Sequence, residues 1–169
     1  MNGKPLEIEY KYLIEYPDTV FLATLPRYEM QEILQIYTRL PTGRKCRIRK
    51  SVQNGTVKYE KTFKQDVTAK TRVEIEEEIT KEEFDALSLL RISDRLPIEK
   101  VRHSFFLNGF VYQIDVFPFW NDRAFLEIEV ESEDIEPPIP DFIHVVKDVT
   151  EDKRYRNSAL SQQVIFEEI

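Results

Sequence analysis

The chain has 169 residues, which suits one domain with a substantial core, and we expect residues 1–169 to form it. The formal net charge of −7 argues against general nucleic-acid binding, which needs a basic surface. A single cysteine excludes an intrachain disulfide, and no apolar run approaches the ~20 residues that span a bilayer. A cytoplasmic protein with no nucleic-acid or membrane partner is therefore the expectation.

The first predicted element is a strand that opens with Glu7-Ile8-Glu9-Tyr10-Lys11. Its alternation puts two carboxylates and an ammonium on one face and apolar side chains on the other. A loop with a short helix should follow, because the next stretch contains two prolines and no clean period. Residues 33–40 alternate again, and after a turn the strand 45–49 carries three cations on one face.

Asn54-Gly55 is the strongest hairpin signal in the chain, and it leads into a strand at 57–64. After a polar loop, residues 72–79 interleave acidic and apolar side chains. Thr80-Lys81-Glu82-Glu83 has the pattern of a capping box, so a helix should begin there.

The last third of the chain adds a second hairpin, a further strand and two helices to the prediction. In order, we expect strands at 99–107 and 110–117 around Asn108-Gly109, a strand at 125–131, a proline-rich stretch at 136–140, and helices at 141–147 and 151–166.

Nearly every predicted strand has one charged face and one apolar face. A solvated antiparallel sheet would look the same strand by strand. However, cations and anions gather on different strands, and about eight strands can close into a barrel with room for one small ligand. We therefore predict an α+β, mainly β fold, in which a closed eight-stranded antiparallel β-barrel has a charged interior and amphipathic helices packed outside.

Such an interior must pair its charges or hold charged ligands, because unpaired buried charge is too costly. Lysine and arginine suit a ligand with several phosphates, and clustered glutamates supply oxygen ligands for Mg²⁺ or Mn²⁺. The two histidines, His103 and His144, have no partner at ligand spacing, so no zinc site is expected.

The charged motifs stand in a fixed order along the chain. They are Glu7-Ile8-Glu9-Tyr10-Lys11, Gln35 with Tyr37, Arg47-Ile48-Arg49, Thr62-Phe63-Lys64, Arg72-Val73-Glu74-Ile75-Glu76, Lys100-Val101-Arg102, Asp115, Glu127-Ile128-Glu129, and the closing stretch 149–157. This ordered set resembles the CYTH superfamily, also called triphosphate tunnel metalloenzymes, and is most similar to its short bacterial inorganic triphosphatases. The first motif alone would be weak, but the resemblance spans essentially the whole chain.

The resemblance implies a tunnel that binds a triphosphate together with Mg²⁺ or Mn²⁺. It implies metal ligands at Glu7, Glu9, Glu127 and Glu129, with Glu76 and Asp115 in support. It implies phosphate contacts from Lys11, Arg47, Arg49, Lys64, Lys100 and Arg102. Lys11, Tyr37, Glu74 and Lys100 are the catalytic candidates, with Tyr37 as the partner of Lys11. For each residue the alternative is a structural ion pair across the tunnel.

The expected activity is hydrolysis of inorganic tripolyphosphate to pyrophosphate and phosphate, with one metal on the phosphates and a second polarising a water. A class IV adenylate cyclase is the first alternative, although no base-reading motif is recognisable. A thiamine triphosphatase would need an aromatic site such as Trp120 or Phe119. A non-catalytic polyphosphate- or nucleotide-binding module is the third alternative. A homodimer is expected by analogy alone.

Overall fold

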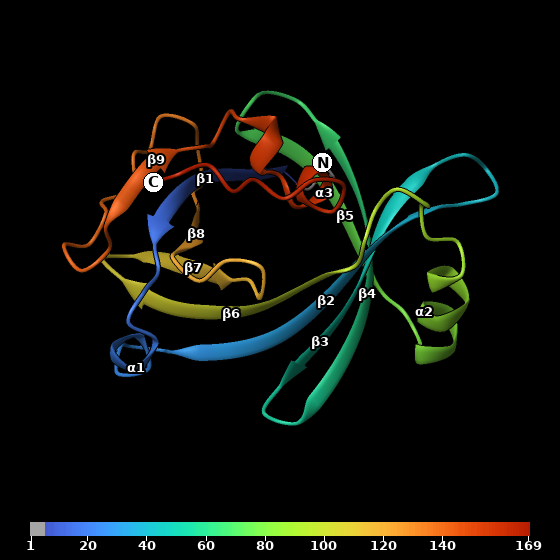
Figure 1. Ribbon diagram of the computed structural model, residues 1–169, viewed down its shortest axis with the longest axis horizontal. Coiled ribbons are helices and arrows are strands. Elements are labelled where there is room, and N and C mark those ends of the chain that lie inside the picture. The colour runs from blue at the N-terminus through green and yellow to red at the C-terminus, as the bar shows by residue number, and fades with distance from the viewer. Residues whose placement is uncertain (1–5) are drawn as a thin grey trace.

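The computed structural model describes residues 6–169, and Figure 1 shows it as a β-barrel with short helices around it. The strands are β1 (Leu6–Glu15), β2 (Glu29–Arg39), β3 (Lys45–Gln53), β4 (Thr56–Asp66), β5 (Thr71–Glu78), β6 (Ile98–Leu107), β7 (Phe110–Val116), β8 (Arg123–Glu129) and β9 (Val145–Asp148). The helices are α1 (Thr19–Leu22), α2 (Lys81–Ser88), α3 (Asn157–Leu160) and a 3₁₀ turn at Lys153–Tyr155. None of the helices in this part of the chain has the length and apolar character needed to cross a membrane.

The strands follow the order β5-β4-β3-β2-β6-β7-β8-β1-β9, and β5 also pairs with β1. One edge of β1 pairs with β8 from Glu9 to Glu15, while the other edge pairs with β5 only from Leu6 to Ile8. These pairings close an eight-stranded antiparallel barrel, which confirms the predicted fold class. The extra strand, β9, occupies the edge of β1 that β5 leaves uncovered.

Both predicted Asn-Gly hairpins are present. Asn54 and Gly55 have φ angles of 49° and 77°, and Asn108 and Gly109 have 51° and 83°. A two-residue turn with both φ values positive matches the right-handed twist of the strands it joins, and Asn-Gly adopts it at low steric cost. These turns set the register of β3 against β4 and of β6 against β7.

The outer apolar face is covered in two different ways. Phe84 of α2 packs over Ile36, Ile48 and Ile79, so this helix covers β2–β4 as predicted (Figure 1). The outer face of β1 and β6–β8 is covered mainly by the segment 130–143, which forms no helix. Its backbone is fixed to the barrel, because the hydroxyl of Tyr112 donates a hydrogen bond to the carbonyl of Pro138 at 2.6 Å.

The helix predicted at 141–147 is wrong, because residues 145–148 form β9 instead. The free edge of β1 offers unpaired backbone groups to this segment, and pairing with them outweighs the weak local helix signal. The helix predicted at 151–166 is too long, because only the 3₁₀ turn and α3 are helical in this stretch.

The C-terminal segment packs into one end of the barrel rather than lying on its outside. Tyr155 and Leu160 are each 2% exposed, and they contact inward-facing apolar side chains that include Leu13 and Phe125. Trp120 belongs to the same cluster, and its indole N–H donates to the carbonyl of Ile165 at 2.8 Å. The barrel interior is therefore apolar at this end and charged elsewhere.

Candidate active site

A cavity of about 390 Å³ lies inside the barrel. Its ten cationic lining residues are Lys11, Lys45, Arg47, Arg49, Lys64, Arg72, Arg95, Lys100, Arg102 and Arg156. Its six carboxylates are Glu7, Glu9, Asp66, Glu74, Glu127 and Asp152. Because cations outnumber carboxylates, the cavity is suited to a ligand that carries several negative charges.

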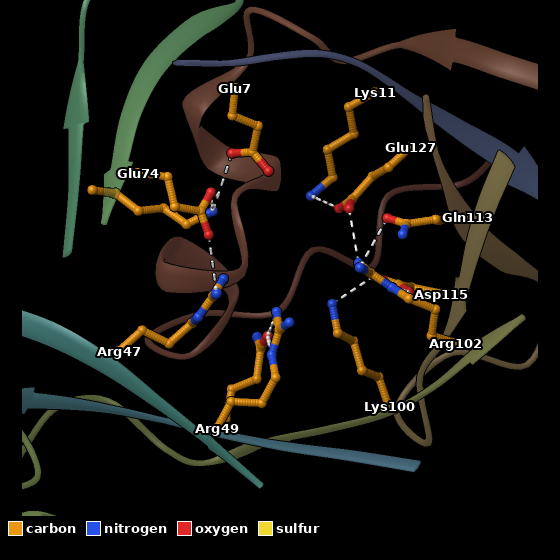
Figure 2. Close-up of polar contacts among 12 residues, drawn as sticks. Glu7, Lys11, Arg47, Arg49, Glu74, Lys100, Arg102, Gln113, Asp115 and Glu127 are labelled. Carbon is orange, nitrogen blue, oxygen red and sulfur yellow. Dashed lines mark hydrogen bonds and ion pairs between the residues drawn. The ribbon is translucent and has the colours of Figure 1, made fainter. Parts of the chain in front are cut away.

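A chain of alternating charges runs along one wall, across β1, β8, β6 and β7 (Figure 2). Lys11 Nζ lies 3.3 Å from Glu127 Oε1, and Arg102 Nη2 lies 2.9 Å from Glu127 Oε2. The first contact follows from the register, because Lys11 faces Glu127 across the β1–β8 pair. Burial would raise the pKa of Glu127, but Lys11 and Arg102 hold it well below its usual range.

Asp115 ends this chain by binding two cations at once. Its Oδ1 accepts from Arg102 Nε at 2.7 Å, and its Oδ2 accepts from Lys100 Nζ at 2.5 Å and Arg102 Nη2 at 2.8 Å. Asp115 is fully buried and does not line the cavity. Burial lowers the pKa of Lys100 to about 7, although the attraction of Asp115 opposes this shift. Asp115 thus fixes the orientation of two cations that do line the cavity.

A second chain of alternating charges follows the opposite wall (Figure 2). Glu7 Oε2 lies 3.6 Å from Arg72 Nε and 3.5 Å from Lys64 Nζ. Lys64 Nζ also lies 3.1 Å from Glu74 Oε2, and Glu74 Oε1 lies 3.4 Å from Arg47 Nη2. Burial and a hydrogen bond with Glu74 raise the pKa of Glu7 to about 8. Glu7 therefore holds a proton more readily than Glu74, whose pKa is lowered.

Glu9 and Arg49 lie between the two chains, and neither forms an ion pair with another of the described residues. Burial and the nearby Glu127 raise the pKa of Glu9. Arg49 is held by a neutral group, because its Nε and Nη2 donate to Gln35 Oε1 at 3.2 and 2.7 Å. Among the cavity side chains on the described strands, Glu9 thus has no ion-pair partner, and Arg49 is the arginine that no carboxylate binds.

The carboxylates in the cavity fit a divalent cation, although they are not gathered around one point. Within residues 6–169, no group of three or more histidine, cysteine or acidic side chains is close enough to hold a metal ion. Glu9, however, faces Glu129 in register on β8, and Glu127 is near enough to raise its pKa. Carboxylate oxygens crowded in this way are suitable ligands for Mg²⁺ or Mn²⁺. Such an ion would have to draw Glu127 away from Lys11.

Of the fourteen predicted site residues, eleven line the cavity. They are Glu7, Glu9, Lys11, Tyr37, Arg47, Arg49, Lys64, Glu74, Lys100, Arg102 and Glu127. Glu76 and Glu129 are exposed on their strands, and Asp115 lies behind Lys100 and Arg102.

Tyr37 lines the cavity without a hydrogen bond to Lys11 among the described residues, and Lys11 instead lies over the Phe125 ring at 4.1 Å from its centre. Trp120 and Phe119 pack in the apolar cluster and do not line the cavity.

The sequence prediction missed several cavity residues that lie outside the barrel strands. Arg95 comes from the loop before β6, and Arg156 from the C-terminal segment, where it binds Asp66 at 2.8 Å. Thr150 fastens this segment to β1, because its hydroxyl oxygen lies 3.0 Å from the amide nitrogen of Lys11 and 3.2 Å from its carbonyl oxygen. Such segments have no strand period, so no face could be assigned to them from sequence. Lys45 also lines the cavity, on the cationic face that alternation predicts for the strand 45–49.

The CYTH domain matches residues 5–156 of the chain. The solved structure of the inorganic triphosphatase NE1496 is 30% identical, with a TM-score of 0.54, over 92% of this chain and 94% of that one. A conserved hypothetical protein from Pyrococcus furiosus is 28% identical, with a TM-score of 0.53, over 76% of this chain and 80% of its own. A putative adenylate cyclase from Vibrio parahaemolyticus is 18% identical, with a TM-score of 0.50, over 78% and 80%, which shows a shared fold alone. No curated protein matches the chain.

Proposed function

The chain belongs to the CYTH domain family, and on that premise we propose that it hydrolyses inorganic tripolyphosphate to pyrophosphate and phosphate with Mg²⁺ or Mn²⁺. The observation that carries the proposal is the excess of cationic over acidic side chains lining the cavity. Arg49 is central to it, because no carboxylate binds its guanidinium. The similarity to the triphosphatase NE1496 over nearly the full length of both chains supports the same activity.

The substrate is held by the cations between the two walls. Arg49 and Arg47 bind phosphate oxygens on one side, and Lys100 and Arg102 bind them on the other, with Lys11 and Lys64 beside them. Arginine can form two parallel hydrogen bonds with a phosphate, while lysine acts as a point charge. Because most of these cations are largely buried, their attraction for phosphate is stronger than it would be in water.

The metal would bind Glu9 and Glu127, with Glu7 and Glu129 next to them on the same two strands. A bound Mg²⁺ or Mn²⁺ would neutralise phosphate charge and lower the pKa of a water ligand towards neutrality. The donor set of carboxylate oxygens suits these ions. Glu76 lies near Arg47, with Glu76 Oε2 3.7 Å from Arg47 Nη2, and is better suited to holding that arginine than to binding the ion.

Water attacks the terminal phosphorus, the bond to the pyrophosphate oxygen breaks, and negative charge shifts to that leaving oxygen. Lys100 and Arg102 stabilise this charge, because Asp115 holds both cations in place before the reaction. On the other wall, the raised pKa of Glu7 favours its neutral form, which reduces repulsion of the phosphates. Catalysis in this account rests on positioning and electrostatics.

The first experiment compares phosphate release from tripolyphosphate with cyclic AMP formation from ATP, each under Mg²⁺ and then Mn²⁺. We expect metal-dependent phosphate release and no cyclic AMP. Cyclic AMP formation would favour the class IV adenylate cyclase instead, and tight binding of tripolyphosphate without turnover would favour a non-catalytic module. Thiamine triphosphatase is less well supported, because Trp120 and Phe119 pack away from the cavity.

The small triphosphate is the only partner we propose, and the homodimer and cytoplasmic location expected from sequence stay predictions. Size-exclusion chromatography with light scattering would test the homodimer.

A further inference from the structure

Gln35 lies in the middle of β2 on the face that points into the barrel, opposite Arg49 of β3. It is completely buried. Its Oε1 accepts two hydrogen bonds from the Arg49 guanidinium, at 3.2 Å from Nε and 2.7 Å from Nη2. Its Nε2 has no hydrogen-bond partner among the described residues. Because Oε1 takes both guanidinium N–H groups, the orientation of the amide is set by Arg49.

The other arginines of the cavity wall are held differently. Arg47 is bound by Glu74, and Arg102 is bound by Asp115 and Glu127. The carboxylate nearest to Arg49 in the sheet register is Glu60 on β4, and Lys58 binds it at 2.5 Å. Arg102 also donates to the amide oxygen of Gln113 at 2.9 Å, in addition to its two carboxylates. Among the cavity arginines on the barrel strands, in the part of the chain described, Arg49 is therefore the one that an amide holds without any carboxylate partner.

An amide and a carboxylate of the same shape would have opposite effects at this position. A carboxylate would hold the guanidinium more strongly, because it adds the attraction between opposite charges to the hydrogen bonds. It would also offset part of the positive charge that attracts a phosphate. An amide fixes the geometry and leaves the charge available to a ligand.

We propose that Gln35 is a positioning residue that orients Arg49 for a phosphate group of the substrate while leaving the guanidinium charge uncompensated. This inference rests on the proposed triphosphatase function for the identity of the ligand. The surroundings of Arg49 agree with it, because burial and the positive charges of the nearby Arg47 and Arg102 lower the pKa of Arg49 to about 10.

The test compares Gln35→Glu with Gln35→Met. The glutamate variant keeps an acceptor for Arg49 but adds negative charge, whereas the methionine variant loses the acceptor and adds no charge. The matched control is Gln53→Glu, which makes the same change on the inner face of β3, four residues from Arg49. Two measurements are made. Steady-state kinetics gives the KM and kcat for tripolyphosphate with Mg²⁺, and calorimetry gives the Kd of pyrophosphate without metal.

We expect Gln35→Glu to raise the KM and the pyrophosphate Kd by about tenfold or more, because the new charge competes with phosphate. Gln35→Met should raise both by only about threefold, because Arg49 keeps its charge and loses only the acceptor that orients it. A merely structural role predicts the reverse order, because glutamate is the better anchor for Arg49. Equal or milder effects of Gln35→Glu would overturn the proposal, as would equal effects of the control.

The outcomes also separate this inference from the proposed function. If the wild-type protein releases no phosphate from tripolyphosphate, the proposed function fails, and the ranking of pyrophosphate affinities still decides the role of Gln35. If the wild type is active and the two Gln35 variants show the reverse order, only the role of Gln35 fails. Should Gln35→Met not fold, comparison of Gln35→Glu with the control still decides, because unchanged pyrophosphate binding contradicts the proposal.

Discussion

Lys11 and Glu127 form a buried ion pair between β1 and β8, with Nζ 3.3 Å from Oε1. Arg102 holds the other oxygen of Glu127 at 2.9 Å. Glu127 is thus neutralised by two cations, while Glu9 forms no ion pair within the described residues and has a raised pKa. Glu9 is therefore the carboxylate most available to a divalent cation, and the Lys11–Glu127 pair must loosen when the cation also binds Glu127.

Replacing Glu9 with glutamine should remove the response to metal without harming the fold. The change deletes a crowded charge, so the metal-free variant should be at least as stable as the wild type. Mg²⁺ and Mn²⁺ should raise the melting temperature of the wild type and leave that of Glu9→Gln unchanged. Thermal unfolding with and without metal checks this expectation, and equal metal stabilisation of both proteins would contradict it.

Replacing Asp115 with asparagine should destabilise the protein by about 3–5 kcal/mol, because Lys100 and Arg102 would lose a buried partner. Urea unfolding at neutral pH measures the loss. Asp122→Asn is the matched control, since Asp122 is exposed and its partner Arg123 keeps a hydrogen bond to the carbonyl of Glu167, so this change should alter stability little. If Asp115→Asn kept full stability and lost only metal affinity, Asp115 would be a metal ligand rather than a positioning residue.

Glu7 should make the metal-free protein less stable as the pH rises from about 5 to 8. The pKa of Glu7 is about 8 in the folded protein, against its ordinary value of 4.5, which we take for the unfolded chain. The folded protein therefore binds more protons than the unfolded chain across this window. Stability therefore falls as pH increases. Glu7→Gln should flatten this slope, which denaturant titrations at several pH values in the presence of a chelator would detect. An unchanged slope would show that Glu7 ionises normally in the folded protein.

The C-terminal segment should contribute strongly to stability. Leu160 is 2% exposed in the apolar end of the barrel, so Leu160→Ala should cost about 2–5 kcal/mol. Leu89 is 87% exposed, and Leu89→Ala should change the free energy of unfolding by less than about 0.5 kcal/mol. Similar small effects from both variants would mean that the C-terminal segment does not pack into the barrel in solution.

The parts of the fold that sequence predicted well are those with local signals. Asn54-Gly55 and Asn108-Gly109 require backbone angles that few other residue pairs adopt, and alternation along β1 assigns Glu7, Glu9 and Lys11 to one face. The strand β9 could not be predicted in the same way, because it depends on an edge of β1 that lies far away in sequence.

The candidate site shows the same contrast between local sequence signals and contacts made by distant segments. Alternation correctly predicted that Asp115 faces inward, but it could not show that Lys100 and Arg102 cover it from the cavity. How far an inward-facing side chain lies from the cavity depends on the side chains of neighbouring strands. The alternation within one strand does not reveal this distance. Arg95 and Arg156 reach the cavity from irregular segments, where no period exists.

The central claim is that Glu9 and the cavity cations together bring about metal-dependent cleavage of tripolyphosphate. Ion chromatography of a reaction with Mg²⁺ or Mn²⁺ measures this directly, because it separates tripolyphosphate, pyrophosphate and phosphate. We predict equal amounts of pyrophosphate and phosphate from the wild type, no products with a chelator, and about 100-fold slower turnover by Glu9→Gln. Undiminished product formation by Glu9→Gln, or by the wild type in chelator, would contradict the account.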